Sequence, residues 1–412
     1  ALVCSQTGTI SRPITRLEYP MNFTYFIPTK ILFGSGSFNA LAKEELPGTK
    51  ALVVITAGKS MRANGYLDRL LSMLDAKGIG HVVFDKILPN PVLKHVHEGA
   101  ELARANGCDF VIGLGGGSSI DTAKSIAVMV KNPGNYWDYI FGGSGGRKPL
   151  SEPVLPIVAI ATTAGTGTEA DPWTVITKED TNEKIGFGCN QTFPALSVVD
   201  PELMLTIPPH LTAYQGFDAL FHAIEGFIAK IATPLSDAYA LKSIELLTRW
   251  LPVAVRDGSN LEAREQVAIA STLAGMVEST SSCTSEHGME HALSAYYPAL
   301  PHGAGLIMLS ESYFTFFADK CPELFSKLAQ TMGVDVAALP EQDRPMAFVG
   351  ALMDLQASCG VRNLKMSDFG IKAEDMPLCA ENARQTMGGL FRLDRYRLSP
   401  EETEAIMRNA YK

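Results

Sequence analysis

Four side chains in two stretches of the sequence could bind one metal ion. Asp218 and His222 are four residues apart in GFDALFHAIEGF, so on a helix both would project from the same face. His287 and His302 lie in a second His-rich stretch, in which His291 follows His287 by one helical turn. One carboxylate and three imidazoles form an oxygen and nitrogen donor set that suits Fe(II), Zn(II) or Mn(II).

A structural interpretation competes with the metal site, because a histidine on an apolar helix is usually a hydrogen-bonded core residue. Clustering favours the metal, since four of the eight histidines in the chain lie in these two stretches. The residues around Asp218 are strongly apolar, and a carboxylate buried there without a partner would be unfavourable. We therefore predict a metal site.

Two further segments could hold phosphate. Gly115-Gly116-Gly117-Ser118 stands between an expected strand at 110–114 and an expected helix at 119–130, where backbone N–H groups favour an anion. The spacing is not GxGxxG, and a tight turn capped by Ser118, with Asp121 completing a capping box, explains it equally well. Thr162–Glu169 follows the expected strand 154–161 and predicts a second cradle, with a solvated Thr/Gly turn as the alternative.

Short apolar runs alternate with helical patterns in the first half, which predicts an α/β domain with a doubly wound, mostly parallel sheet. Expected strands are 51–56, 81–84, 110–114 and 154–161, with further strands or hairpins at 173–177, 184–188 and 196–199, and expected helices are 67–77, 92–106 and 119–130. After Pro208 the pattern is helical, at 213–230, 236–250, 261–278, 321–332, 345–359 and 400–411. We predict two domains, 1–207 and 208–412, with a hinge at 205–209.

Composition limits the class of protein. The chain has 412 residues, 46% of them hydrophobic and 19% charged, as in a globular enzyme. Its formal charge of −9 disfavours nucleic-acid and anionic-membrane partners, and neither a membrane span nor a signal peptide is expected. Seven scattered cysteines without a CxxC pair indicate reduced thiols in the cytoplasm, and Cys283 is not expected to be a ligand despite its closeness to His287.

Five motifs carry a resemblance to a known family. GLGGGSSIDTAK, ATTAGTGTE, GFDALFHAIEGF, HGMEH and PHG, in this order, resemble the iron-containing (group III) alcohol dehydrogenases. The resemblance runs from about Phe26 to the C-terminal helix. It implies an N-terminal dinucleotide-binding domain, an all-α C-terminal metal-binding domain, and a metal in the cleft between them. It also implies NAD(P)(H)-dependent conversion of a small alcohol or aldehyde, and a homodimer or larger homo-oligomer.

The resemblance assigns residues to both parts of the site. The implied metal ligands are Asp218, His222, His287 and His302, and His291 matches a catalytic residue beside the nicotinamide. The stretch from His291 to His302 is one residue longer than in most relatives, but it still ends in PHG. The positions that match cofactor contacts are Asn90, Gly116, Gly117, Ser118, Asp121, Thr162, Thr163, Thr166 and Lys184.

The loop after the first strand bears on the choice of cofactor. Relatives that prefer NAD place an Asp there to accept from the ribose 2′-hydroxyl, whereas this chain reads Gly58-Lys59-Ser60. Lys59 could supply charge to a 2′-phosphate, and Gly58 and Ser60 could supply donors. The sequence therefore favours NADP(H) over NAD(H). The alternative is that Lys59 is a solvated surface charge and either cofactor is used.

The implied chemistry uses Fe(II), with Zn(II) as the alternative, as a Lewis acid on the substrate oxygen. His291 would orient the nicotinamide or relay the alcohol proton. Related enzymes of the same fold are the rivals: a glycerol-type dehydrogenase, a maleylacetate-type reductase or a dehydroquinate synthase-like lyase, followed by a non-enzymatic binding protein. The aromatic residues near the motifs indicate either a small apolar substrate pocket or helix packing, and they are Phe217, Phe221, Tyr296 and Tyr297.

Overall fold

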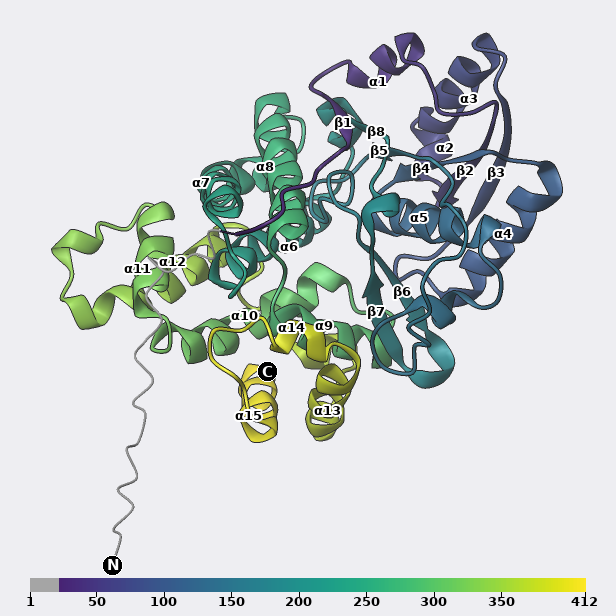
Figure 1. The fold of residues 1–412 in the computed structure, drawn as a ribbon. Coiled ribbons are helices and arrows are strands. Elements are labelled where there is room, and N and C mark those ends of the chain that lie inside the picture. Colours follow the sequence, from purple (N-terminus) through teal and green to yellow (C-terminus); the bar gives the residue numbers. More distant parts are fainter. Residues whose placement is uncertain (1–21) are drawn as a thin grey trace, which may run out of the picture.

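A computed structural model describes residues 22–412, and they form a parallel sheet followed by a helical region (Figure 1). The six-stranded sheet has the order β1-β8-β5-β4-β2-β3, and all of its strand pairs are parallel. Its strands are β1 (Lys30–Phe33), β2 (Lys50–Thr56), β3 (Gly80–Ile87), β4 (Phe110–Gly115), β5 (Ile157–Ala161) and β8 (Leu196–Val199). A separate antiparallel hairpin pairs β6 (Thr174–Lys178) with β7 (Glu183–Phe187).

Both faces of the sheet are buried, which explains why its central strands are apolar at successive positions. The alternate residues Ala51, Val53 and Ile55 of β2 pack with α3, whereas Leu52 and Val54 pack with α4 and α5. The helices of this half are α1 (Ser37–Ala40), α2 (Ser60–Ala63), α3 (Tyr66–Ala76), α4 (Leu93–Asn106) and α5 (Gly117–Lys131). This arrangement is the predicted doubly wound α/β fold.

The chain from residue 209 onward contains helices and no strand among the described residues. Its α-helices are α6 (Pro209–Ile228), α7 (Pro234–Arg256), α8 (Leu261–Thr280), α9 (Ser285–Tyr296), α10 (His302–Ala318), α11 (Pro322–Thr331), α12 (Arg344–Ser358), α13 (Met376–Thr386), α14 (Gly388–Phe391) and α15 (Pro400–Ala410). They enclose one large apolar core in which α6 is buried along most of its length. The helical second half agrees with the fold class predicted from the sequence.

Several finer expectations can be placed in this fold. The boundary at 207/208 falls between the last strand, which ends at Val199, and the start of α6 at Pro209. The sequence pattern missed α9 and α10, which are buried nearly all round, and α13, whose buried residues do recur at helical spacing. No helix of residues 22–412 is long and apolar enough to cross a membrane. The expectation about a signal peptide concerns residues outside the described part.

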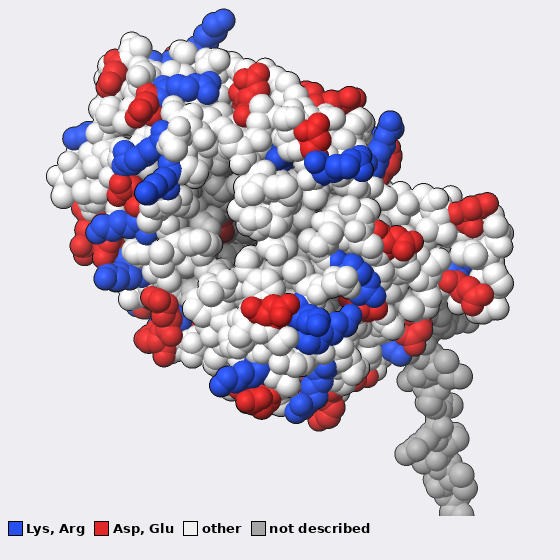
Figure 2. Space-filling model, turned by 180° about the vertical axis from the view of Figure 1, so that it is seen from behind, with Lys and Arg blue, Asp and Glu red and all other residues white. Residues whose placement is uncertain are grey.

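One face of the molecule has mixed charges and a central hollow. On the face opposite to that of Figure 1, acidic and basic side chains are interspersed, with no broad basic patch on that face (Figure 2). The same face is hollowed near its centre, and acidic atoms are visible inside the hollow. The six cysteines of the described residues are all free, and most of them are buried.

Candidate metal centre

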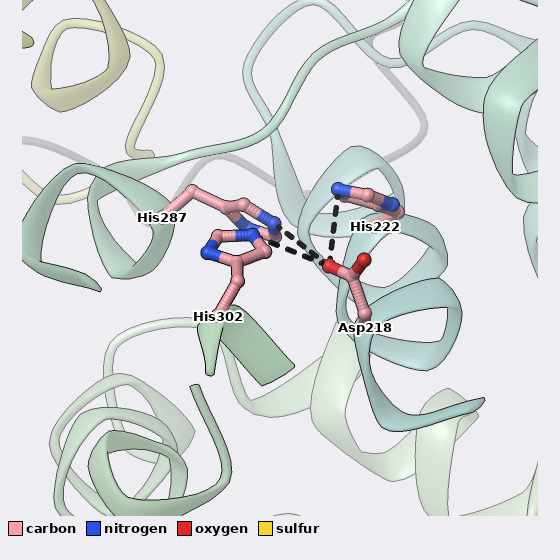
Figure 3. A group of neighbouring side chains, drawn as sticks. All are labelled: Asp218, His222, His287 and His302. Atoms are coloured by element: carbon pink, nitrogen blue, oxygen red, sulfur yellow. Dashed lines mark ion pairs between the residues drawn. The ribbon is translucent and has the colours of Figure 1, made fainter. Parts of the chain in front are cut away.

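Four side chains meet around one carboxylate oxygen (Figure 3). Asp218 Oδ1 lies 3.5 Å from His222 Nε2, 3.6 Å from His287 Nε2 and 3.4 Å from His302 Nε2. The four ligand atoms all lie within 4.8 Å of one another. The structure therefore brings together all four residues that the sequence suggested as metal ligands, His302 included.

Three helices supply these side chains. Asp218 and His222 are one turn apart on α6, and His287 lies in the first turn of α9. His302 is the first residue of α10, directly after Pro301. Because the ligands come from segments far apart in the chain, the site exists only when these helices are packed.

Two buried glutamates orient the imidazoles from behind. Glu225, one turn after His222 on α6, forms a short hydrogen bond through Oε1 with His287 Nδ1. Its other oxygen accepts from the Thr284 backbone N–H at 2.7 Å. Glu290 forms the equivalent short bond with His302 Nδ1. Each bond fixes the ring so that Nε2 points to the centre, the usual arrangement behind metal-bound histidines.

The polar atoms at the centre fit a divalent cation. Asp218 Oδ1 and His287 Nε2 are buried and have no hydrogen-bond partner. Burial by itself would raise the pKa of Asp218, but the histidines around it, chiefly His222, hold that pKa well below 3.8. Burial lowers the pKa of His222 to about 3, so this imidazole is neutral at physiological pH. An ionised carboxylate and neutral imidazole are the protonation states in which these groups bind metals.

His291 lies beside the cluster without belonging to the set of four. Its ring centre is 5.4 Å from that of His302 and 6.3 Å from that of His287. The side chain is buried, and its Nδ1 has no hydrogen-bond partner. Burial and the nearby Lys184 charge keep the pKa of His291 well below 6.5, so the ring is neutral.

Lys184 and Asn90 connect the two halves of the molecule next to His302. Lys184 Nζ, on β7, donates to Ser294 Oγ at 2.8 Å and lies 3.4 Å from Glu290 Oε2. Asn90 Nδ2 donates to the backbone carbonyl of Pro298 at 2.8 Å, just before His302. The structure thus places both residues against the segment that carries a metal ligand, where the resemblance had suggested cofactor contacts.

The two predicted phosphate-binding turns lie side by side. Gly115 ends β4 and pairs with Ala161, the last residue of the neighbouring β5. A Cβ on Gly116 would meet Thr163 Oγ1 at 3.0 Å, and one on Gly117 would meet Thr166 Cγ2 at 2.5 Å. Glycine is therefore required at 117 because the threonine turn occupies the space beside it.

The capping alternative for the first turn is wrong in this structure. Helix α5 begins at Gly117 with Gly116 as N-cap, and no side chain caps it. Ser118 Oγ instead donates to the Pro89 carbonyl at 2.5 Å. The Asp121 carboxylate points inward, accepting from Thr168 Oγ1 at 2.7 Å and from the Val175 N–H at 2.9 Å. Asp121 thus shapes the threonine turn from beneath, and the first turn keeps its backbone groups unblocked by a side-chain cap.

The loop after β2 lies at the same edge of the sheet. β2 lies between β3 and β4 in the sheet. From β2 the chain continues to β3 on one side, and then crosses over to form β4 on the opposite side of β2. Such a switch point is where open α/β sheets bind ligands. Gly58, Lys59 and Ser60 follow β2 after Ala57 and are exposed. Their position is compatible with a contact to the ribose end of a dinucleotide.

Sequence reasoning missed several residues of the site. The sequence analysis did not identify Glu225 and Glu290. Each stands three residues after a candidate ligand, at 222/225 and 287/290, which is helical spacing. Glu278 Oε1 lies 3.5 Å from His222 Nε2, and Cys283 Sγ donates to Glu278 at 2.9 Å. Glu278 has no pattern that distinguishes it in sequence, whereas Cys283 was noted for its closeness to His287 and was not expected to be a ligand. In contrast, Phe217 and Phe221 lie fully in the helical core, which favours the packing interpretation for these two rings.

Comparison with known proteins matches both halves of the chain to one family. The family model described as iron-containing alcohol dehydrogenase matches residues 28–201, and the C-terminal model of the Fe-containing alcohol dehydrogenase family matches 212–411. The chain is 36% identical to a 1,3-propanediol dehydrogenase of Citrobacter freundii, over 89% of this chain and 93% of the relative. It is 33% identical to an NAD-dependent methanol dehydrogenase of Bacillus methanolicus, over 87% of this chain and 92% of that relative.

Solved structures agree. An alcohol dehydrogenase from an archaeal halo-thermophile of a Red Sea brine pool superposes with a TM-score of 0.90 at 34% identity, covering 95% of this chain and all of that one. The name of the methanol-oxidising relative specifies NAD, and the comparisons do not support the NADP(H) preference expected from Lys59. The match of both family models, together with the assembled ligand set, shows that this chain belongs to the iron-containing alcohol dehydrogenase family and is an alcohol dehydrogenase.

Proposed function

We propose that this enzyme exchanges a hydride between a nicotinamide dinucleotide and a small alcohol or aldehyde at the Asp218, His222, His287 and His302 centre. The observation that carries the proposal is the convergence of four donor atoms within 4.8 Å of one another, three of them on buried residues and the fourth on the partly buried His302. Fe(II) is the ion we propose for the centre, and Zn(II) suits the same donor set. When bound, the metal supplies Lewis acidity to the substrate oxygen and the nicotinamide supplies or accepts the hydride.

The remaining residues act on the cofactor and on protons. Backbone N–H groups of Gly116, Gly117 and Ser118 bind pyrophosphate in this proposal, which is supported by the lack of a side-chain cap at the start of α5. The hydroxyls of Thr162, Thr163 and Thr166 form the adjoining wall. His291 is neutral and keeps Nδ1 free of protein partners, so it can orient the nicotinamide or take the alcohol proton. Lys184 and Asn90 hold the His302 segment against this half.

The decisive assay follows oxidation of NADH or NADPH with short aldehydes. Anaerobically purified protein would be compared after chelation and after addition of Fe(II) or Zn(II). We expect turnover that chelation removes and metal restores. A complete lack of turnover with every aldehyde, on both cofactors and with metal bound, would contradict the proposal.

The cofactor preference has its own test in Lys59. If Lys59 contacts a 2′-phosphate, Lys59→Ala lowers kcat/KM for NADPH about tenfold, the size of one charge-assisted hydrogen bond, and leaves NADH use almost unchanged. Equal effects on both cofactors would identify Lys59 as a solvated surface charge. A homodimer or larger assembly, and a cytoplasmic location, are further proposals that rest on family resemblance and free thiols.

A further inference from the structure

A short segment near the C-terminus binds the two helices that carry three of the four candidate ligands. Residues Leu393, Asp394 and Arg395 form a strap between α14 and α15, and Figure 1 shows α14 beside α9. The backbone carbonyl of Leu393 accepts from the Lys230 N–H at 2.9 Å, just past the end of α6. The two charged residues of the strap bind the facing ends of α6 and α9.

Asp394 caps the beginning of α9, which has no cap of its own. The N-cap residue Thr284 makes no side-chain bond to the first turn, where backbone N–H groups lack partners within the helix. Asp394 Oδ1 accepts from the Ser285 N–H at 3.1 Å. Glu225 Oε2 accepts from the N–H groups of Thr284, at 2.7 Å, and His287, at 3.4 Å. Carboxyl groups from two distant segments therefore hold the turn that carries a candidate ligand.

Arg395 caps the C-terminal end of α6. The last turn of this helix contains no basic residue, and its final carbonyl groups carry partial negative charge. Arg395 Nε donates to the Ile228 carbonyl at 3.0 Å, and its Nη2 donates to the Ala229 carbonyl at 3.1 Å. The planar guanidinium thus holds two neighbouring carbonyls at once, which a lysine ammonium does not match in geometry.

The Asp394 carboxyl is buried in a group of hydroxyls. The residue is 2% exposed, and Tyr313 Oη donates to its Oδ1 at 3.3 Å. The same phenol lies 3.0 Å from the hydroxyls of both Thr284 and Ser285. Burial raises the pKa of Asp394 to about 7. The bond to the Ser285 N–H does not require the charge, because a neutral carboxyl can carry its proton on Oδ2, which has no partner, and accept at Oδ1.

The strap bears on the contact between Glu225 and His287. Glu225 lies one turn before the carbonyls that Arg395 holds. His287 lies two residues after the N–H that Asp394 holds. Because Asp394 and Arg395 are adjacent in the chain, the end of α6 and the start of α9 cannot separate without breaking one set of these bonds.

We propose that Asp394 and Arg395 are positioning residues for the metal centre, which hold the end of α6 against the start of α9 and so keep Glu225 in contact with His287. The proposal rests on the metal-dependent function proposed above. It implies that loss of either residue lowers metal affinity. The proposed cofactor-binding turns lie in the other half of the molecule, so cofactor affinity should not change.

Zn(II) affinity of the full chain, measured by competition with a chelator, tests the proposal. Zn(II) is the probe because it has no redox chemistry. Asp394→Ala and Arg395→Ala should each weaken Zn(II) binding about two- to thirtyfold, the range for residues that modulate a site through packed neighbours. NADH affinity, measured by fluorescence titration, should stay at the wild-type value. In the Glu225→Gln background, Asp394→Ala should have a smaller effect, because both changes act on one contact.

Conservative variants and two controls separate positioning from general stability. Asp394→Asn keeps an acceptor and should retain most of the Zn(II) affinity, whereas Arg395→Lys should retain only part of it. Arg397→Ala removes an exposed charge two residues away. Ser399→Ala removes the side-chain cap of α15, which carries no candidate ligand, and lowers the unfolding temperature by loss of a cap. Neither control should weaken Zn(II) binding.

Wild-type Zn(II) affinity in both alanine variants would overturn the proposal, as would an equal loss in Ser399→Ala at the same unfolding temperature of the metal-free protein. Should the alanine variants fail to fold, Arg395→Lys decides, because an unchanged affinity there overturns the role of the fork. A wild type that binds no Zn(II) would contradict the positioning role and the proposed function together. A wild type that binds metal but converts no aldehyde would contradict the proposed function alone, because positioning is measured by metal affinity.

Discussion

Two of the three imidazoles at the candidate metal centre depend on a residue behind them. His287 is held by Glu225 and His302 by Glu290, and both carboxylates are fully buried. The bond matters because a histidine binds metal through one nitrogen only when the other nitrogen carries the proton. The glutamates therefore select the tautomer in which Nε2 faces Asp218 Oδ1.

Removing one of these carboxylates tests that dependence. Glu225→Gln should weaken metal binding about ten- to hundredfold, since the loss of such an outer partner typically has this effect. Affinity would be measured by competition with a chelator. Glu286→Gln is the control, because Glu286 is buried next to His287 in sequence but has no hydrogen bond to a ligand. Equal metal loss in both variants would contradict an orienting role.

If His291 is not a metal ligand, its removal should lower turnover without lowering the metal content. His291→Ala should lower turnover by about 10²- to 10⁴-fold, the range for loss of a group that transfers a proton. Metal content should stay near that of the wild type, because His291 is not one of the four residues that meet at Asp218. Elemental analysis of the purified variant checks this. Loss of the metal would show that the ligand set is misassigned.

At the scale of elements, the site depends on spacing along helices and on adjacent strand ends. Asp218, His222 and Glu225 lie on one face of α6, and His287 and Glu290 lie on one face of α9. The two phosphate-binding turns meet because β4 and β5 are neighbours with parallel carboxyl ends. A buried Lys124 on α5 fixes the second turn, donating to the carbonyls of residues 168, 171 and 173.

The contact between the turns predicts the effect of a methyl group. In Gly117→Ala the added Cβ would lie 2.5 Å from Thr166 Cγ2, so the turns must separate. Overpacking of this kind costs about 1–3 kcal/mol, which corresponds to a ten- to hundredfold weaker affinity for the cofactor. Thr166→Ser removes the clashing methyl and should restore part of the affinity in the double variant. Fluorescence titration with NADH or NADPH measures the cofactor affinity of the single and the double variant.

At the scale of the whole molecule, the four candidate metal ligands connect three helices of the second half, and contacts beside them connect the two halves. Asn90 bonds to the Pro298 carbonyl, Trp173 to the Glu278 carbonyl, and Thr272 to the Glu169 carboxylate at 2.7 Å. A close approach of Gly167 to Gly275 joins the threonine turn to α8. The candidate metal centre and the proposed cofactor-binding turns therefore lie at one interface between the two halves.

Metal removal should accordingly lower the stability of the protein. An ion that binds only the folded state stabilises it by about 4 kcal/mol at a thousand times its Kd, which is an unfolding temperature change of several degrees. Thermal unfolding before and after chelation, and after addition of Fe(II), measures the change. The variant His222→Ala should show little response to chelation. An unchanged unfolding temperature in the wild type would mean that the four residues do not hold a metal.

Much of this protein can be predicted from local patterns in the sequence. The strands at 51–56 and 110–114 follow from unbroken apolar runs, and the four ligands follow from helical spacing and family motifs. Helices α9 and α10 could not be predicted from periodicity, because they are buried nearly all round and so have no polar face. The preference for NADP(H) rested on the absence of an acid after the first strand and on the run Gly58-Lys59-Ser60, and sequence context does not show what these exposed residues contact.

The sequence by itself determined the type of fold, the donor set and the two strand-end turns, because each depends on residues that are close together in the chain. Only the tertiary structure decided which other side chains contact the donor set and the turns. Glu225 and Glu290 became orienting groups, Asp121 turned inward, and Glu278 came to lie beside His222. The physical reason is that contacts between side chains on different elements, up to 62 residues apart for Glu225 and His287, depend on how those elements pack, which local patterns do not encode.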